Sequence, residues 1–230
     1  MNKKLLGMGL LTALFFMACE KDSTNDVTEP EAQERFQINS DQNELSKSLD
    51  FTNAGVVGVT SVGLSRNQDS NNLIGIEQIA FINPPSINGQ VLRATDVDFQ
   101  NNFIYVAYTK EGADYLGGID IIDISDEYNP RIVNRILSPF ADINAISISG
   151  NQLYFTGAYY DGEDDNPDRA FIASSSLNNG EFSNDVALKL NVSGFTGVEI
   201  LKIENNFISL TGSNGILGQY DINSGNEITT

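Results

Sequence analysis

The sequence predicts an all-β protein, a β-propeller with four-stranded blades, of which about three to four are present. First, apolar residues alternate with polar ones, as in a β-strand, at three places in the chain. Second, each copy ends in a pair of turn-forming residues and leads into another apolar strand. Third, the copies are offset by 49 and 55 residues, near the length of a propeller blade. The alternating pairs are Val97 and Phe99, Ile146 and Ile148, and Leu201 and Ile203; the turns are Asn101-Asn102, Gly150-Asn151 and Asn205-Asn206.

The strand that follows the first turn supports a stacked arrangement of sheets. It reads FIYVAY, and apolar residues occupy both alternating positions. Such a strand is expected to be buried on both faces, which suits a blade between two neighbours better than a sheet with one solvated face. A β-sandwich or an irregular repeat is the alternative. Before this repeat, the apolar runs 56–62 and 73–82 predict part of a hairpin.

Composition limits the classes of partner. The chain has 230 residues with 31 Asp and Glu against 13 Lys and Arg, so it carries a formal charge of −18. This charge repels nucleic acids and anionic lipids, although it also serves simply to keep an exported protein soluble. The sequence contains no His, which excludes imidazole bases, Ser-His triads and His-ligated zinc within it.

The N-terminus predicts export and lipid attachment. Residues 1–18 form a signal peptide: Lys3 and Lys4 precede an apolar run that is too short to span a bilayer as a helix. Ala18 then precedes Cys19, the only cysteine of the chain. The segment resembles a bacterial lipoprotein signal, although Phe16 stands where that family usually has Leu. The resemblance implies that the peptide is removed and that Cys19 carries the lipid; an ordinary secretory signal is the alternative.

The residues after Cys19 predict a spacer. Lys21 and Asp22 resemble the surface-export signal of lipoproteins in the Bacteroidetes group, which favours the cell surface over the periplasmic side of the outer membrane. Residues 19–50 are polar and acidic without apolar periodicity, so we expect a flexible tether to the membrane. An edge strand formed by Phe36 and Ile38 is the alternative. Residues 51–230 would then form the partial propeller.

The best-preserved repeat resembles a known family. Residues 94–133 are similar to the LVIVD repeat, in which a Tyr-Val pair is followed by an apolar strand, Asp-x-Ser-Asp and Pro. Tyr105-Val106, residues 121–126 and Pro130 match this pattern. The resemblance implies a propeller in exported proteins and assigns no catalytic residue. Because propellers close with four to eight blades, we expect these residues to be the front part of a longer protein, with ring closure by an oligomer as the alternative.

Two loops are the candidate binding sites, because in a propeller the loops after each second strand and the loops into the next blade share one face. They are residues 109–118, with Tyr115, and residues 157–169, with Tyr159 and Tyr160, whose rings could stack on a sugar or a peptide. Carboxylates in the second loop predict a possible Ca²⁺ site, with a solvated acidic loop as the alternative. These carboxylates are Asp161, Glu163, Asp165 and Asp168.

We therefore expect a surface-anchored binding or interaction module for an unknown protein or glycan. A hydrolase or lyase acting on a carbohydrate or lactone is the alternative, although no pair of carboxylates is fixed at a working distance by the sequence. The repeated residues Asp96, Asp123 and Asp221 are expected to form turn and strand-end hydrogen bonds rather than to act in catalysis.

Overall fold

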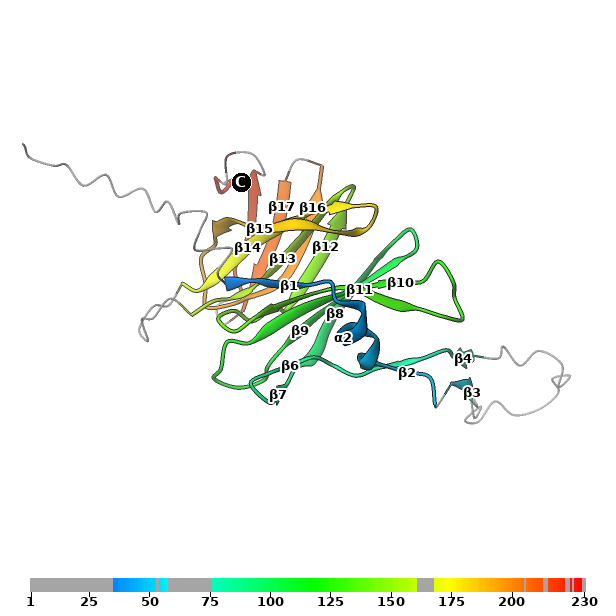
Figure 1. The fold of residues 1–230 in the computed structure, drawn as a ribbon. Helices are drawn as coiled ribbons and strands as arrows, with labels where there is room; N and C mark the ends of the chain where they lie inside the picture. The colour runs from blue at the N-terminus through cyan, green and yellow to red at the C-terminus, as the bar shows by residue number, and fades with distance from the viewer. Residues whose placement is uncertain are drawn as a thin grey trace, which may run out of the picture.

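The computed structural model describes residues 35–52, 54–57, 76–160, 168–204, 206–212, 215–221, 224 and 226–228. The fold is all-β, as predicted (Figure 1). It consists of several antiparallel sheets, and none of them closes on itself within these residues. In the same part of the chain, no helix has the length and apolarity needed to cross a bilayer.

Three sheets make up the body of the domain. The first sheet contains β8 (Arg93–Gln100), β9 (Phe103–Thr109), β10 (Gly117–Asp123) and β11 (Arg131–Ser138) in sequence order. The second contains β12 (Ala145–Ser149), β13 (Gln152–Ala158), β14 (Ala170–Asn178) and β15 (Glu181–Asn191), also in sequence order. The third contains β16 (Gly197–Ile203), β17 (Asn206–Thr211) and β18 (Leu217–Asp221). Each sheet is therefore a simple meander.

The C-terminal residues add a short pairing to the third sheet. Tyr220 forms an isolated antiparallel bridge with Glu227. The amide of Asp221 donates to the carbonyl of Asn226 over 2.9 Å, and the amide of Ile228 donates to that of Gln219 over 2.7 Å. The chain thus begins to pair on β18 where the repeat pattern places a fourth strand.

The predicted turns are confirmed in the first two copies and shifted in the third. Asn101 and Gly150 have φ values of 56° and 61°, as a two-residue hairpin turn requires. In the third copy Ile203 pairs with Asn206, so the turn lies one residue earlier than predicted. A one-residue shift exchanges the two faces of a strand. Ile200 is consequently buried, whereas Leu201 is 52% exposed, because Ile200 belongs to the core between the second and third sheets.

The sheets pack against one another through strands that are buried on both faces. The core between the first and second sheets includes Tyr105, Ile119, Ile146 and Phe155. A second core, between the second and third sheets, is centred on Tyr154 and Phe207, whose rings are 4.7 Å apart, and is completed by residues such as Ile172 and Ile200. Because β13 and β14 contribute to both cores, the second sheet is enclosed between its neighbours.

Two aspartates join the edge strands of the first and second sheets. The Oδ2 atoms of Asp96 and Asp98 on β8 accept hydrogen bonds from the amides of Ile146 and Ile148 on β12, over 2.9 and 2.8 Å. These carboxylates satisfy amides on an edge strand that has no strand partner on that side. The expectation that Asp96 forms strand hydrogen bonds is confirmed. It is likewise confirmed for Asp123, which accepts from the Ser125 amide, and for Asp221, which accepts from the Ser224 amide.

Residues 35–50, which the sequence places in the flexible tether, pack on the first sheet instead. They form β1 (Gln37–Asn39), α2 (Gln42–Leu45), the 3₁₀ turn η1 (Ser46–Ser48) and β2 (Leu49–Asp50). β1 pairs with β11, so the alternative of an edge strand is correct (Figure 1). The reason is burial: Phe36 and Leu45 are 8% and 1% exposed, and Leu45 packs on Ile122 and Ile132. Few but well-placed apolar residues offset the ordering entropy of this segment.

Three small two-stranded sheets involve the residues before the first sheet. β3 (Gly55–Val57) pairs with β4 (Ile76–Gln78), which confirms the predicted hairpin in its described part; residues 58–75 between them lie outside the described residues. β5 (Phe81–Ile82) pairs with β2, and β6 (Ser86–Ile87) pairs with β7 (Gln90–Val91). The β6–β7 turn brings Asn88 and Gly89 to the end of the domain where the longer loops lie.

A buried ion pair holds the N-terminal segment and the first sheet together. Asp120 is fully buried, and Arg135 is 9% exposed. The guanidinium donates from Nε and Nη2 to the two carboxylate oxygens, over 2.6 and 2.8 Å. Its Nη1 donates to the hydroxyl of Ser48 over 3.2 Å, which links the pair to η1. Both charges are thus compensated inside the protein.

We expect Arg135→Ala to lower the free energy of unfolding by about 3–5 kcal/mol, because it leaves the buried Asp120 without its cation. Urea denaturation of the purified protein measures this change. The control is Arg131→Ala. This change removes a second ion pair between the same two strands, that of Arg131 with Asp123, in which the arginine side chain is 59% exposed. That change should cost less than about 1 kcal/mol. Equal losses for the two variants would contradict this assignment.

Candidate functional site

A cavity of about 650 Å³ opens at one end of the domain. Its walls come from the β6–β7 turn, the β9–β10 loop, the β11–β12 loop, the β13–β14 loop and the β15–β16 loop. This end therefore gathers the loops after the second strands and the loops into the next sheet, the two sets that the repeat pattern places on one face. The lining residues are Asn88, Gln90, Gly112, Ala113, Asp114, Tyr115, Leu116, Pro139, Phe140, Asp142, Tyr160, Arg169 and Phe195.

Backbone hydrogen bonds tie these loops to one another. The amide of Tyr160 donates to the carbonyl of Phe140 over 2.8 Å, which connects the β13–β14 loop with the β11–β12 loop. The amide of Arg169 donates to the carbonyl of Gly194 over 3.0 Å, which connects it with the β15–β16 loop. The Leu116 amide donates to Oδ1 of Asp142 over 3.2 Å and adds the β9–β10 loop. Two bonds between main-chain groups and one from a main-chain amide to the Asp142 side chain thus hold the pocket in shape.

One wall of the pocket is aromatic. The rings of Tyr115 and Tyr160 stack with centroids 6.0 Å apart and an interplanar angle of 27°. Arg169 donates from Nη1 to the Tyr115 hydroxyl over 2.5 Å, and its guanidinium carbon lies 5.4, 6.0 and 5.7 Å from the ring centres of Tyr115, Tyr160 and Phe195. The cation thus holds the three rings together through a hydrogen bond to Tyr115 and cation–π contacts with all three. Phe140 is 46% exposed and adds another ring at the opening.

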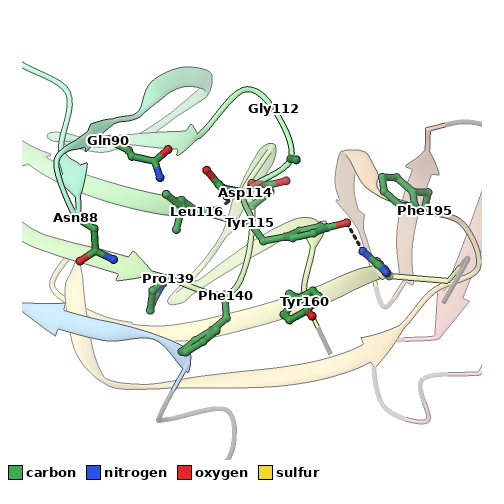
Figure 2. A pocket seen from close by; sticks show the side chains of 13 residues that line it. Asn88, Gln90, Gly112, Asp114, Tyr115, Leu116, Pro139, Phe140, Tyr160 and Phe195 are labelled. Carbon is green, nitrogen blue, oxygen red and sulfur yellow. Dashed lines mark hydrogen bonds between the residues drawn. The ribbon is translucent and has the colours of Figure 1, made fainter. Parts of the chain in front are cut away.

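The other wall carries two amide groups beside the apolar side chains of Leu116 and Pro139. Figure 2 shows Asn88 and Gln90 at one side of the pocket and Tyr160 and Phe195 at the other, with Phe140 between them. Asn88 adopts a φ of 50° in the β6–β7 turn, a conformation that Asn tolerates better than most residues. Its amide and that of Gln90 each offer both donors and an acceptor to a molecule in the cavity. A ligand would therefore meet rings on one side and amides on the other.

Asp142 is the most perturbed carboxyl group of the site. Burial raises its pKa from 3.8 to about 6, and this effect outweighs the polar groups of Thr109 and Leu116, which favour the charged form. Gly157 and Asp142 approach closely: a Cβ on Gly157 would lie 2.0 Å from the Asp142 carbonyl oxygen. The absence of a side chain at Gly157 thus allows the β11–β12 loop to lie against β13.

The structure brings together two of the three predicted ligand-binding tyrosines. Tyr115 and Tyr160 line the pocket. Tyr159, which points elsewhere, packs edge-on against Phe171 at 6.1 Å and lies under the guanidinium of Arg35 at 5.1 Å. It serves the core because neighbouring residues of an extended chain face opposite sides. Tyr159 therefore does not line this pocket, and its role in ligand binding stays a prediction.

The predicted Ca²⁺ site falls mostly outside the described residues. Asp161, Glu163 and Asp165 lie there, as does Cys19. Asp168 is described, and its Oδ1 accepts a hydrogen bond from the Gly194 amide over 2.7 Å. In the described ranges no three His, Cys, Asp or Glu side chains gather to hold a metal ion. Calcium binding by the loop remains a prediction.

Sequence reasoning missed much of the site. Asn88, Gln90, Phe140, Asp142, Arg169 and Phe195 all line the pocket and were not predicted. Phe140, Asp142 and Phe195 could have been found, since they lie in the loops that lead into the next repeat. The β6–β7 turn precedes the regular repeat, so no signal in the sequence placed Asn88 and Gln90 there.

No protein-family model matches this sequence, and a search of the curated proteins gives no significant match.

We expect Asp142 to reduce stability as the pH rises. Its unfolded-state pKa lies near 3.8 and its folded-state pKa near 6, so the unfolded chain releases the proton first. The free energy of unfolding therefore falls between these values, by on the order of 2–3 kcal/mol. The amide of Asp142→Asn does not titrate. The free energy of unfolding of this variant minus that of the wild type should therefore rise by this amount from pH 4 to pH 7. Urea denaturation at each pH measures the difference. A constant difference across that range would contradict the burial argument.

Proposed function

We propose that this protein is a lipid-anchored surface lipoprotein whose β-domain, a propeller of LVIVD-like repeats, binds a ligand in the loop-end pocket. The observation that carries the proposal is the pocket itself. Rings, amides and a partly buried carboxyl group from five separate loops converge on one cavity of about 650 Å³. That volume lies within the range of small-molecule sites, and such sites are usually preformed concave clefts with a few placed polar groups.

The arrangement of the sheets supports the propeller interpretation. The first strands of the three meanders, β8, β12 and β16, are neighbours in space. Apolar side chains are exposed on the outermost faces, where a further sheet would pack. Val97 and Phe99 are 62% and 59% exposed on the first sheet, and their structural equivalents Ile146 and Ile148 lie at the interface between the first two sheets. Leu201 and Leu217, on the third sheet, are 52% and 70% exposed.

Features of the sequence support the proposed localisation. The short apolar run before Cys19 and the Lys-Asp pair after it support lipid attachment and display at the surface of the outer membrane. The charge of −18 makes nucleic acid an unfavourable partner. We propose a protein or a glycan as the ligand.

A second candidate is a hydrolase or lyase acting on a carbohydrate or lactone. One observation favours it: Asp114 and Asp142 both line the pocket, and burial raises the pKa of Asp142 to about 6, which suits a general acid. The binding function is preferred because the pocket is organised by the packing of rings and the polar wall is made of amides. Release of a new reducing end from an oligosaccharide, lost in Asp142→Asn, would favour the enzyme.

We expect cells expressing this protein to incorporate labelled palmitate into it, and Cys19→Ser to abolish the label, because the thiol is the attachment point. Gel autoradiography of the immunoprecipitated protein measures this. Cell-surface protease digestion of intact cells then tests the side of the membrane. Unchanged labelling in the variant would contradict the anchor.

We expect the pocket to bind at least one member of a panel of soluble glycosides, dipeptides and nucleosides, detected by saturation-transfer NMR on the mature protein in detergent micelles. Tyr160→Ala should weaken that binding about tenfold, equivalent to the loss of about 1.4 kcal/mol of ring contact. Tyr128→Ala is the control, because Tyr128 is 66% exposed in the β10–β11 connection and does not line the pocket. An affinity that is unchanged in Tyr160→Ala, or equal losses of affinity in both variants, would contradict the proposed site.

A further inference from the structure

We propose that the pocket binds the uncharged ring of a saccharide, a conclusion that rests on the proposed function and narrows its ligand to one class. The inference combines three features of the cavity: its shape, the division of its walls into rings and amides, and the balance of its charges.

Shape favours a small ring over a protein surface. Standard protein interfaces bury about 800 Å² on each partner, and such areas are usually broad and shallow. Here five loops line an open cavity of about 650 Å³. A protein ligand could enter it only with a protruding segment, whereas a terminal sugar fits a concave site without rearrangement of the main chain.

The two walls match the two kinds of surface on a sugar ring. A pyranose offers an apolar C–H face and a rim of hydroxyl groups. Tyr160 and Phe140 expose 39% and 46% of their surface and present apolar area for the first. Asn88 and Gln90 present donors and acceptors for the second. A purely apolar ligand would make no hydrogen bonds with these amides.

Charge disfavours an anionic ligand. Among the described lining residues, the carboxyl groups of Asp114 and Asp142 outnumber the one basic side chain, that of Arg169. Arg169 is 5% exposed, hydrogen-bonded to Tyr115 and surrounded by three rings, so its charge is already engaged. The overall charge of −18 adds a repulsive field for phosphates and uronates. The same ring cluster cannot cage a quaternary ammonium ligand, because Arg169 occupies that role.

Asp142 supplies a carboxyl group that can accept hydrogen bonds in the cavity. Its Oδ1 accepts one hydrogen bond, from the Leu116 amide. A carboxylate accepts further bonds, since each oxygen carries more than one lone pair, and O–H···O⁻ bonds are stronger than those between neutral groups. A ring hydroxyl that donates to Asp142 while the C–H face lies on Phe140 or Tyr160 would use both walls at once.

The test is isothermal titration of the mature protein in detergent micelles at pH 7 with methyl β-glucoside, methyl β-galactoside, methyl α-mannoside and methyl β-N-acetylglucosaminide. Glucuronate and glucose 6-phosphate are the anionic comparators. We expect at least one neutral glycoside to bind at least tenfold more tightly than both anions. Phe140→Ala and Asp142→Asn should each weaken that glycoside about tenfold, and Tyr128→Ala should leave its affinity unchanged.

The outcomes separate the two proposals. If a dipeptide or nucleoside binds in a Tyr160-dependent manner and no neutral glycoside does, the saccharide inference is overturned and the binding function stands. If an anion binds best, the charge argument fails and the inference with it. If no probe depends on any pocket residue, both proposals fall. Urea denaturation verifies that each variant is folded, and Tyr160→Phe, which keeps the ring, should retain glycoside binding where Tyr160→Ala loses it.

Discussion

The enclosure of the second sheet is the constraint on which the rest of the structure depends. The described side chains of β13 are almost all buried, and those of β14 are buried along most of its length. A sheet with two apolar faces is stable in water only when another layer covers each face. The first sheet covers one face through a core that includes Phe155, and the third covers the other through the contact of Tyr154 with Phe207.

This stacking determines where the pocket forms. Each meander runs back and forth between the same two ends, so face-to-face packing places equivalent loops beside one another. At one end the hairpins β8–β9, β12–β13 and β14–β15 have tight turns of two residues, such as Asn101-Asn102, although the β10–β11 connection there spans residues 124–130. At the other end the loops that line the pocket meet, and backbone hydrogen bonds such as Tyr160 to Phe140 join them. Rigid strands thus position a site that consists of loops, as is common in β-proteins.

The sequence predicted what short-range patterns encode. Alternation and turn residues located the strands of the first two meanders, and the apolar character of FIYVAY predicted burial on both faces, which β9 confirms. The third turn was misplaced by one residue because Asn205-Asn206 is a better local turn than Glu204-Asn205. The observed position of the turn accompanies the burial of Ile200 against the second sheet, a long-range contact that no local sequence pattern indicates. The N-terminal segment was misjudged for the same reason, since its polar composition hides the two residues, Phe36 and Leu45, that secure it.

The site shows the same division. Tyr115 and Tyr160 were predicted from the loops that contain them, and their stacking required only that the two loops be neighbours. The partly buried carboxyl group of Asp142 and the amides of Asn88 and Gln90 depend on tertiary placement, because an isolated Asp or Asn in a loop looks like a turn residue in any sequence. Arg169 is a further case: nothing in its neighbourhood along the chain distinguishes a cation surrounded by rings from one in solvent.

The pairing of β1 with β11 has a consequence for how the domain would stand on a membrane. Gln37 lies opposite Leu137, and Arg35 lies over Tyr159, so the chain joins the domain beside the loops that form the pocket. With the lipid that we propose on Cys19, the residues up to 34 can extend over at most about 55 Å. The pocket and the point where the N-terminal segment enters the domain would then lie at the same end of the domain. A bound molecule would be held within that distance of the bilayer, close enough to be part of the cell's own envelope.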